Sequence, residues 1–241
     1  MTGRPRRRAM RMIMSPRPEI RPRNTDGRGR VLWPALLLGL GLLASGPSLE
    51  AAVLVVQPAT GETMPAGVTE KAQTVAGVTK VERYLLVRTQ PHDVIGIEGD
   101  APLRIVTREG KVIEGKLEVG KAFRKDDEAK NVAIVGKIYA EDYGLRGGAG
   151  AMATMKHMFE LGQTFKLTEG GPRIRIVGGF SAKPESEAAK VFLPLMTAQK
   201  LFDREAKLSH LFLAVEGDPD ASARKVQEAL GEGVKVSIAS R

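Results

Sequence analysis

Hydrophobic and polar residues follow one another along the chain in blocks that predict short strands and helices. Residues 53–57 (VLVVQ) are an apolar run typical of a buried strand. Residues 68–75 then carry apolar side chains every three or four positions, which predicts a helix with one buried face. Strand patterns follow at residues 81–87 (VERYLLV) and 93–98 (DVIGIE). The predicted order is strand, helix, strand, strand.

The C-terminal end of the chain repeats the strand–helix–strand order. Residues 208–216 (LSHLFLAVE) and 234–238 (VKVSI) predict strands. Between them, Asp218 is a predicted helix N-cap, Pro219 suits the first helical position, and Gly231 suits the helix end. The two predicted helices share residues at matching positions: Lys71, Gln73 and Gly77 in the first, and Lys225, Gln227 and Gly231 in the second. Two such halves predict an α+β fold with a split βαβ, ferredoxin-like sheet and helices on one face.

A mainly β segment separates the two halves and predicts an inserted lobe. Its strand patterns are short runs bounded by Gly, Pro or charged residues: 103–107, 111–117, 132–135, 164–168, 173–177 and 191–193. Two short helices are also predicted, at residues 137–143 and 194–202. The inward face predicted for the second of these consists of Leu195, Ala198, Leu201 and Phe202. We therefore expect a first lobe from residues 50–100 and 203–241, and an inserted lobe from residues 101–202.

Residues 31–49 (VLWPALLLGLGLLASGPSL) form the longest stretch without a charged residue. In a helix they would span roughly 28 Å, close to the ~30 Å hydrocarbon core of a bilayer. The strongly apolar part is shorter and also has the length of a signal-peptide core. The stretch therefore fits a retained transmembrane anchor or a cleaved signal peptide, and a buried core helix is a third alternative.

The positive charge of the chain is concentrated before this stretch. Ten Arg residues minus Glu19 and Asp26 give residues 1–30 a net charge of +8, out of +9 for the whole chain. A basic flank before an apolar run keeps the N-terminus in the cytoplasm and sends the following residues across the membrane. We expect residues 1–30 to be a basic, disordered cytoplasmic tail with no role in nucleic-acid binding, and residues 50–241 to be exported.

Signatures of enzymes and cofactor sites are poor. The chain has no cysteine, which excludes thiol catalysis and thiolate metal sites. The glycine patch at residues 147–150 (GGAG) lacks the pattern of a phosphate-binding loop, and Ser181 lacks a nucleophile-elbow motif. Asp126, Asp127 and Glu128 lie in one acidic turn, which we expect to be solvated rather than to bind a metal. We predict no catalytic, cofactor-binding or metal-ligating residue.

A methionine-rich segment, AMATMKHM, carries the most distinctive side chains of the inserted lobe. Met152, Met155 and Met158 lie at helical spacing on one face, with His157 beside them. Thioether and imidazole groups are ligands for Cu(I), but such a stripe packs equally well against a core or a partner protein, and we favour packing. Ordinary turn and strand positions are expected for two further histidines, His92 and His210.

A series of short motifs carries a resemblance to a known family. In chain order they are residues 120–123 (GKAF), the acidic turn, 131–136 (NVAIVG), 161–165 (LGQTF), 173–180 (RIRIVGGF), 191–195 (VFLPL) and 197–201 (TAQKL). Together they resemble the MacB-like periplasmic core domain of FtsX/LolC/MacB-type ABC transporter permeases. The resemblance covers about residues 50–240 and implies a porter-type lobe built from both chain ends, with a second lobe inserted.

The resemblance also implies a function and partners. It implies a non-enzymatic extracytoplasmic domain in the periplasm or outside the cell, joined to the inner (cell) membrane by one N-terminal helix or cleaved and secreted. Permeases of this family have three further transmembrane helices after the domain, whereas this sequence ends at Arg241. A truncated permease, a split gene and a stand-alone domain remain open. We expect the partners to be a separate ABC ATP-binding subunit, a multi-helix permease subunit and a periplasmic protein; the alternative is a stand-alone periplasmic binding or adaptor module.

Overall fold

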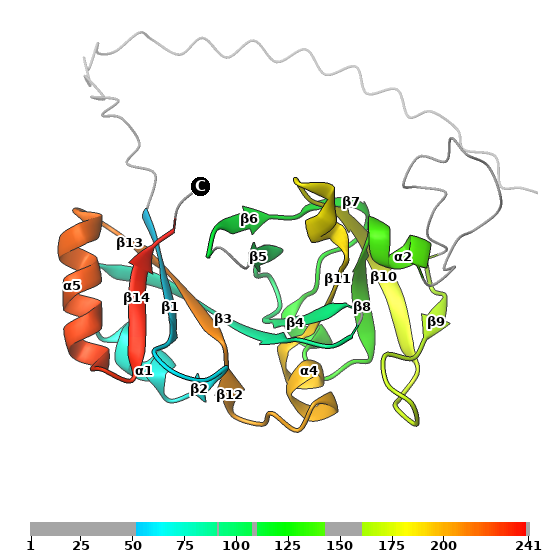
Figure 1. Ribbon diagram of the computed structural model, residues 1–241, viewed down its shortest axis with the longest axis horizontal. Coiled ribbons are helices and arrows are strands. Elements are labelled where there is room, and N and C mark those ends of the chain that lie inside the picture. Colours follow the sequence, from blue (N-terminus) through cyan, green and yellow to red (C-terminus); the bar gives the residue numbers. More distant parts are fainter. Residues whose placement is uncertain (1–51, 91, 108–109, 143–160, 240–241) are drawn as a thin grey trace, which may run out of the picture. The chain divides into compact units, whose positions relative to one another are not determined.

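The computed structural model describes residues 52–90, 92–107, 110–142 and 161–239 (Figure 1). The predicted membrane or signal segment, the glycine patch at residues 147–150 and the methionine-rich segment with Met152, Met155, His157 and Met158 lie outside these residues. No helix within the described ranges has the length and apolar character needed to cross a membrane.

Ten strands of the described residues form one mixed sheet, in the order β14-β1-β13-β3-β4-β11-β8-β10-β7 with β9 also beside β10. Its strands are β1 (Ala52–Pro58), β3 (Val78–Val87), β4 (Asp93–Ile97), β7 (Lys116–Gly120), β8 (Val132–Gly136), β9 (Thr164–Phe165), β10 (Ile174–Ser181), β11 (Lys190–Pro194), β13 (His210–Val215) and β14 (Val234–Ile238). Two short ladders pair β2 (Met64–Pro65) with β12 (Lys207–Leu208) and β5 (Arg104–Val106) with β6 (Val112–Glu114). The helices are α1 (Val68–Gln73), α2 (Lys137–Asp142), α4 (Leu195–Leu201) and α5 (Pro219–Leu230), with 3-10 turns η1 (Lys125–Asp127) and η2 (Glu185–Ala188).

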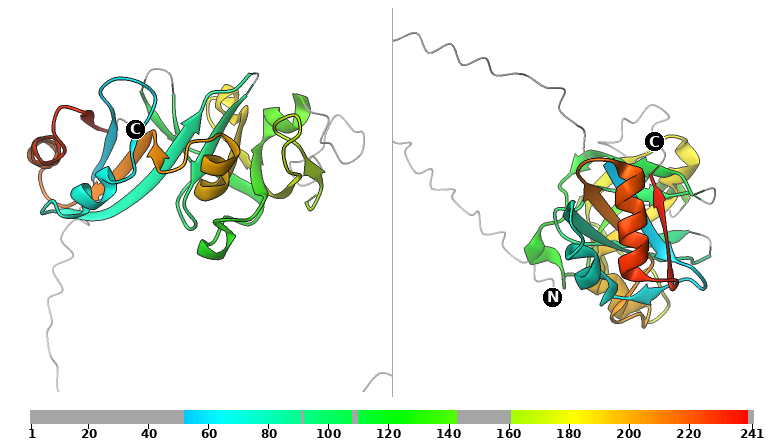
Figure 2. Two further views of the ribbon diagram at one scale, coloured as in Figure 1. Left: turned by 90° about the horizontal axis from the view of Figure 1, so that it is seen from below. Right: turned by 90° about the vertical axis from the view of Figure 1, so that its left-hand side faces the viewer.

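The two ends of the described chain interleave as a split βαβ sheet. The first unit is β1-α1-β3 and the second is β13-α5-β14, and their strands alternate in the order β14-β1-β13-β3 with antiparallel neighbours throughout. Ala72 of α1 and Val226 of α5 are fully buried in the same apolar cluster, so both helices cover one face (Figure 2). The predicted α+β, ferredoxin-like arrangement is confirmed.

The local sequence explains why α5 begins and ends where it does. The Asp218 side chain accepts a hydrogen bond from the backbone N–H of Asp220 at 3.1 Å, and Pro219 occupies the first turn. At the other end, Gly231 adopts φ +78°, which a residue with a side chain rarely tolerates. The predicted cap, first residue and stop of this helix are therefore confirmed.

The same sheet continues from the first predicted lobe into the inserted one. Strand β3 pairs with β13 through residues 78–84 and with β4 through residues 84–87. Strand β4 then pairs with β11 in parallel register, and β11 pairs with β8. One strand ladder thus links segments far apart in the sequence, so the two predicted lobes share a single sheet.

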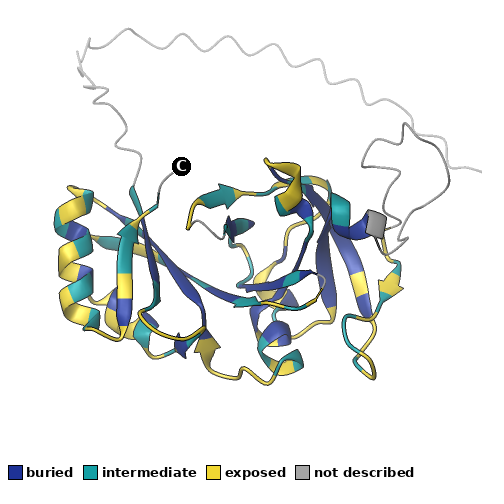
Figure 3. Cartoon of the chain, viewed as in Figure 1, coloured by how far each residue is buried: buried dark blue, intermediate teal, exposed yellow. Residues whose placement is uncertain are grey.

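Most strands of the sheet contain runs of buried residues (Figure 3). Successive side chains of a strand point to opposite sides, and the buried residues form two clusters, one on each face. All four α-helices of the described residues contribute to the cluster on one face. On the other face, Ile105 of the β5–β6 hairpin packs with aromatic side chains, among them Phe180, Phe192 and Phe212. This hairpin, formed by the separate two-stranded sheet, therefore covers part of the face opposite the four described α-helices.

Two predicted strands are divided in the structure. The pattern at residues 208–216 is interrupted at Ser209, whose hydroxyl accepts a hydrogen bond from the backbone N–H of Leu86 at 2.7 Å. The pattern at residues 111–117 is interrupted at Gly115, whose N–H donates to the Leu103 carbonyl at 2.7 Å. In both places a tertiary hydrogen bond replaces continuous strand pairing.

Candidate functional site

Helix α4 forms one wall of a groove that is lined by described residues from several segments. It begins directly after β11 and buries Leu195 and Ala198, as predicted. The helix lies unusually close to β4, because a Cβ added at Gly96 would lie 2.7 Å from the Ala198 Cβ. Leu201 and Phe202, the other predicted inward residues, are partly buried against the same core. The inward face of α4 is therefore confirmed.

Two polar side chains of α4 fix the helix to the segments on either side of it. The buried Thr197 hydroxyl donates to the Lys130 carbonyl oxygen at 3.0 Å. The Gln199 amide donates to the Lys207 carbonyl oxygen at 2.9 Å. These bonds join α4 to the turn after η1 and to strand β12, so the walls of the groove are held by side chains as well as by the sheet.

The acidic turn is a structural element of this wall. Asp127 is only 4% exposed, accepts a hydrogen bond from the Arg124 N–H at 3.1 Å and pairs with Lys130 at 3.0 Å. The hydrogen bond from Lys130, followed by that from Arg124, holds the pKa of Asp127 below its ordinary value. Glu128 accepts from the Gly99 N–H at 2.6 Å. The expectation of a solvated turn is wrong for Asp127, because its carboxylate is buried and is bonded to Arg124 and Lys130 within the turn.

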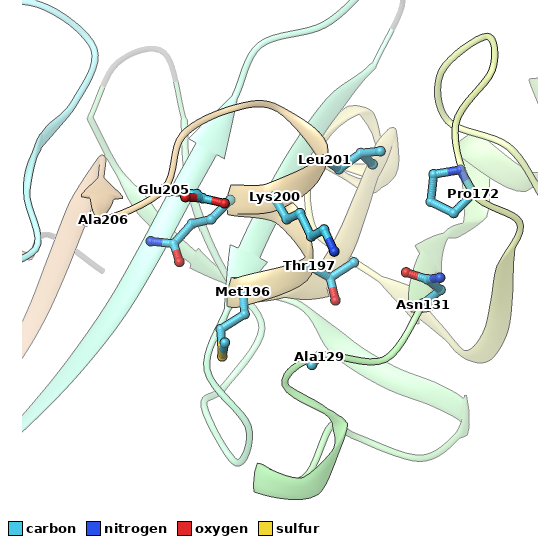
Figure 4. Close-up of a pocket in the computed structure, with 10 residues that line it drawn as sticks. Ala129, Asn131, Pro172, Met196, Thr197, Lys200, Leu201, Glu205 and Ala206 are labelled. Carbon is cyan, nitrogen blue, oxygen red and sulfur yellow. The ribbon is translucent and has the colours of Figure 1, made fainter.

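The groove beside α4 has a volume of about 790 Å³ (Figure 4). It is lined by Ala129, Asn131, Pro172, Met196, Thr197, Gln199, Lys200, Leu201, Glu205 and Ala206. Half of these side chains are apolar, and Met196 is 56% exposed. Lys200 and Glu205 bring one charge of each sign to the groove. Such a surface suits an apolar side chain or a short peptide segment of a partner protein.

The groove lies at the opposite end of the described domain from the chain ends. Ala239 donates a backbone hydrogen bond to the Val53 carbonyl at 2.8 Å, so the first and last described strands meet at one end. Helix α4 and strand β12 lie at the other end of the sheet (Figure 1). A partner bound in the groove would therefore be remote from the point where the chain enters and leaves the domain.

The remaining residues considered as site candidates do not gather at the groove. Ser181 is the last residue of β10, and its hydroxyl donates to the Glu118 carboxylate at 2.8 Å. The rings of His92 and Tyr139 pack edge to face with their centroids 5.0 Å apart. Among the described residues, no group of three or more His, Asp or Glu side chains is arranged to hold a metal ion.

His210 is buried in strand β13 rather than presented to a ligand. Its ring stacks on Phe212 at 6.4 Å, and its Nδ1 lies 2.7 Å from the Ser209 hydroxyl oxygen. Burial, with a smaller contribution from the positive charge of Arg88, lowers the pKa of His210 to about 4. The imidazole is therefore neutral at physiological pH and belongs to the polar interior of the sheet.

Sequence reasoning missed the groove because its walls come from distant segments. The one local signal is Met196, an apolar residue on α4 that lies off the inward face formed by Leu195 and Ala198. A large apolar residue on the outer face of a short helix indicates a contact surface when other apolar side chains surround it, whereas a single exposed apolar residue does not. Those neighbours, Ala129 and Pro172, are brought together only by the fold.

Comparisons with known proteins give a likeness of fold. No protein-family model matches the sequence, and no curated protein matches it. The periplasmic region of MacB from Actinobacillus actinomycetemcomitans has a similar structure, with 11% sequence identity and a TM-score of 0.52, over 78% of this chain and 89% of that one. The extracellular domain of the noncanonic ABC-type transporter YknZ from Gram-positive bacteria is also similar, with 14% identity and a TM-score of 0.50, over 77% of this chain and 99% of that one. The resemblance stated from the sequence is thus confirmed at the level of the fold.

Proposed function

We propose that the chain presents an extracytoplasmic domain of the kind found in ABC-transporter permeases, and that it acts in export or in transmitting ATP-driven motion to periplasmic partners. The observation that carries the proposal is the likeness of fold to domains of two such transporters over more than three quarters of the chain. Fold alone does not specify function, so the proposal also rests on the charge pattern before the domain.

The N-terminal residues support an extracytoplasmic location. The basic residues 1–30 and the apolar residues 31–49 stand in the order that sends the following domain across the inner membrane. In this proposal the chain is a single-pass membrane protein, or a secreted one if the apolar segment is a cleaved signal peptide.

The role that we propose is mechanical rather than enzymatic. Because the chain has no P-loop motif, the energy is proposed to come from a separate ABC ATP-binding subunit, working with a multi-helix permease subunit. No cofactor is assigned to the domain.

The groove beside α4 is proposed as the contact with a periplasmic partner. Its apolar lining around the exposed Met196 fits a protein segment better than a charged small molecule. The same groove favours the second candidate function, a stand-alone periplasmic binding or adaptor module. The two candidates differ in whether a permease and an ATP-binding subunit associate with the chain.

A topology experiment tests the location. A reporter fused after Arg241 that is active only outside the cytoplasm should be active, and one that is active only in the cytoplasm should be silent. Replacing Arg28 and Arg30 by Glu should weaken this orientation, whereas replacing Lys235 and Arg241 should not. Activity of the cytoplasmic reporter at the same site would rule out the proposed function.

A further inference from the structure

Strand β14 forms one edge of the ten-stranded sheet. Two backbone hydrogen bonds to β1, just beyond the two ends of β14, show which residues bond to that strand. The Gly233 carbonyl accepts from the Ala59 N–H at 3.1 Å, and the Ala239 N–H donates to the Val53 carbonyl at 2.8 Å. In an antiparallel strand, successive residues direct their backbone groups to opposite sides. The backbone N–H and C=O groups of the odd-numbered residues of β14 therefore bond to β1. Those of the even-numbered residues point outward, in the plane of the sheet, along its open edge.

The side chain of Gln227, from the last turns of α5, occupies this outer edge. Its Nε2 donates to the Val234 carbonyl at 2.9 Å, and its Oε1 accepts from the Val236 N–H at 3.0 Å. The Nε2 also donates to the Gly231 carbonyl at 2.8 Å, which fixes the amide beside the end of its own helix. One side-chain amide thus satisfies one acceptor and one donor of the edge, as a residue of a neighbouring strand would.

We infer that Gln227 is an edge block: it holds the hydrogen-bonding edge of β14 closed and prevents the sheet from pairing with a second copy of this chain. An unpaired strand edge is a template for another strand, and proteins protect such edges. In the described part of the chain no strand lies beyond β14, and Ile238, at its end, is 42% exposed. The edge therefore needs a protecting device, and the Gln227 amide supplies it.

A second copy is the occupant that the sequence of β14 itself fits. Antiparallel pairing of two β14 strands about Val236 would place Val234 opposite Ile238 and Lys235 opposite Ser237. The apolar residues would face apolar residues, and no lysine would face a lysine, which would otherwise oppose pairing. The outward backbone groups of Val234, Val236 and Ile238 would bond in register once the amide of Gln227 was removed.

Replacing Gln227 by Ala in the full-length chain tests the inference. In the wild-type chain, the Val236 amide should exchange its hydrogen at least tenfold more slowly than the Ile238 amide, although both point outward. In Q227A at low concentration the Val236 amide should lose this protection, and at high concentration the variant should form a dimer that is detected by analytical ultracentrifugation. The matched control is Q199A, which removes another Gln side chain that donates to a backbone carbonyl, and it should not dimerise.

A second variant separates edge pairing from unspecific association. Adding Val236→Pro to Q227A removes the N–H at the centre of the exposed edge but none of the bonds to β1, so the double variant should be monomeric. Slow exchange of the Ala239 amide should show that β14 remains docked in each variant. A Q227A chain that stays monomeric, a double variant that still dimerises, or a wild-type chain that already pairs through β14 would overturn the inference.

Discussion

At the scale of single residues, close backbone contacts decide where a side chain is tolerated. Gly136 ends strand β8, and a Cβ at this position would lie 1.9 Å from the Ala188 carbonyl oxygen and 3.0 Å from the Phe180 ring. The first of these atoms belongs to the backbone and cannot turn away. Glycine is therefore required by space at this position.

Replacing Gly136 by Ala should lower the free energy of unfolding by about 3 kcal/mol, because the strand or the turn before β11 must shift. Urea unfolding followed by circular dichroism measures the change. Gly233→Ala is the control, since no atom lies within 4 Å of a Cβ there, and it should change the free energy by less than about 0.5 kcal/mol. Equal stability of the two variants would contradict the close approach of the Ala188 carbonyl to Gly136.

Burial of His210 should make stability depend on pH. Its pKa is about 4 in the folded chain and near 6.5 in an unfolded one, so between these values only the unfolded chain binds the proton. The free energy of unfolding should therefore fall as the pH drops from 6.5 to 4, by on the order of 3 kcal/mol in total. The measurement is the difference between wild type and His210→Gln across this range. Parallel curves would contradict the buried, neutral imidazole.

At the scale of elements, an ion pair fastens the β5–β6 hairpin to the face of the sheet opposite the four described α-helices. Arg104 of β5 pairs with Glu82 of β3, and their side chains are 14% and 7% exposed. The Arg104 guanidinium also lies over the Phe212 ring, 5.2 Å from its centroid. The hairpin is therefore held by a charge pair and an aromatic contact as well as by Ile105.

Replacing Arg104 by Ala should lower the free energy of unfolding by about 3 kcal/mol, because it leaves the Glu82 carboxylate buried without its main partner. Lys116→Ala removes an exposed partner of Glu118 and should change stability by less than about 1 kcal/mol. Glu82→Leu combined with Arg104→Met should recover most of the loss. If Arg104→Ala is no more destabilising than Lys116→Ala, the hairpin is not fastened in this way.

The elements also show what the sequence determines locally. Helix α5 was predictable because its N-cap, first residue and stop are all encoded within the helix and its flanks. The breaks at Gly115 and Ser209 were not, because each depends on a partner more than ten residues away. Gln73 and Gln227 match in sequence, but this match does not predict the edge contact, in which the Gln227 amide bonds to Val234 and Val236.

At the scale of the whole molecule, strand order decides which parts of the chain depend on one another. The split βαβ order was predictable from the repeated strand–helix–strand pattern. The groove was not predictable, because Met196, Ala129 and Pro172 are far apart in the sequence and come together only in the folded sheet. Because this order interleaves strands from both ends of the chain, the first predicted lobe should depend on both ends.

A chain that ends at residue 202 should lose the folded first lobe. It lacks β13, which lies between β1 and β3, and it lacks β14 and α5, which cover β1. Residues 51–241 without the N-terminal segments should fold, since the domain has a core on both faces of the sheet and needs no disulfide. Amide exchange of β3 compares the two chains. Undiminished protection of β3 in the shorter chain would contradict the split arrangement.

The central claim, that this domain works beside an ABC transporter, is tested most directly by crosslinking in the native cells. A photo-crosslinking residue in place of the exposed Met196 should capture a periplasmic protein, and the purified adduct should contain a multi-helix permease and an ABC ATP-binding subunit, identified by mass spectrometry. The same residue in place of Glu228, on the solvent face of α5, should capture neither. A chain that is exported but yields no permease or ATP-binding subunit in the purified material would contradict the claim and favour the stand-alone adaptor.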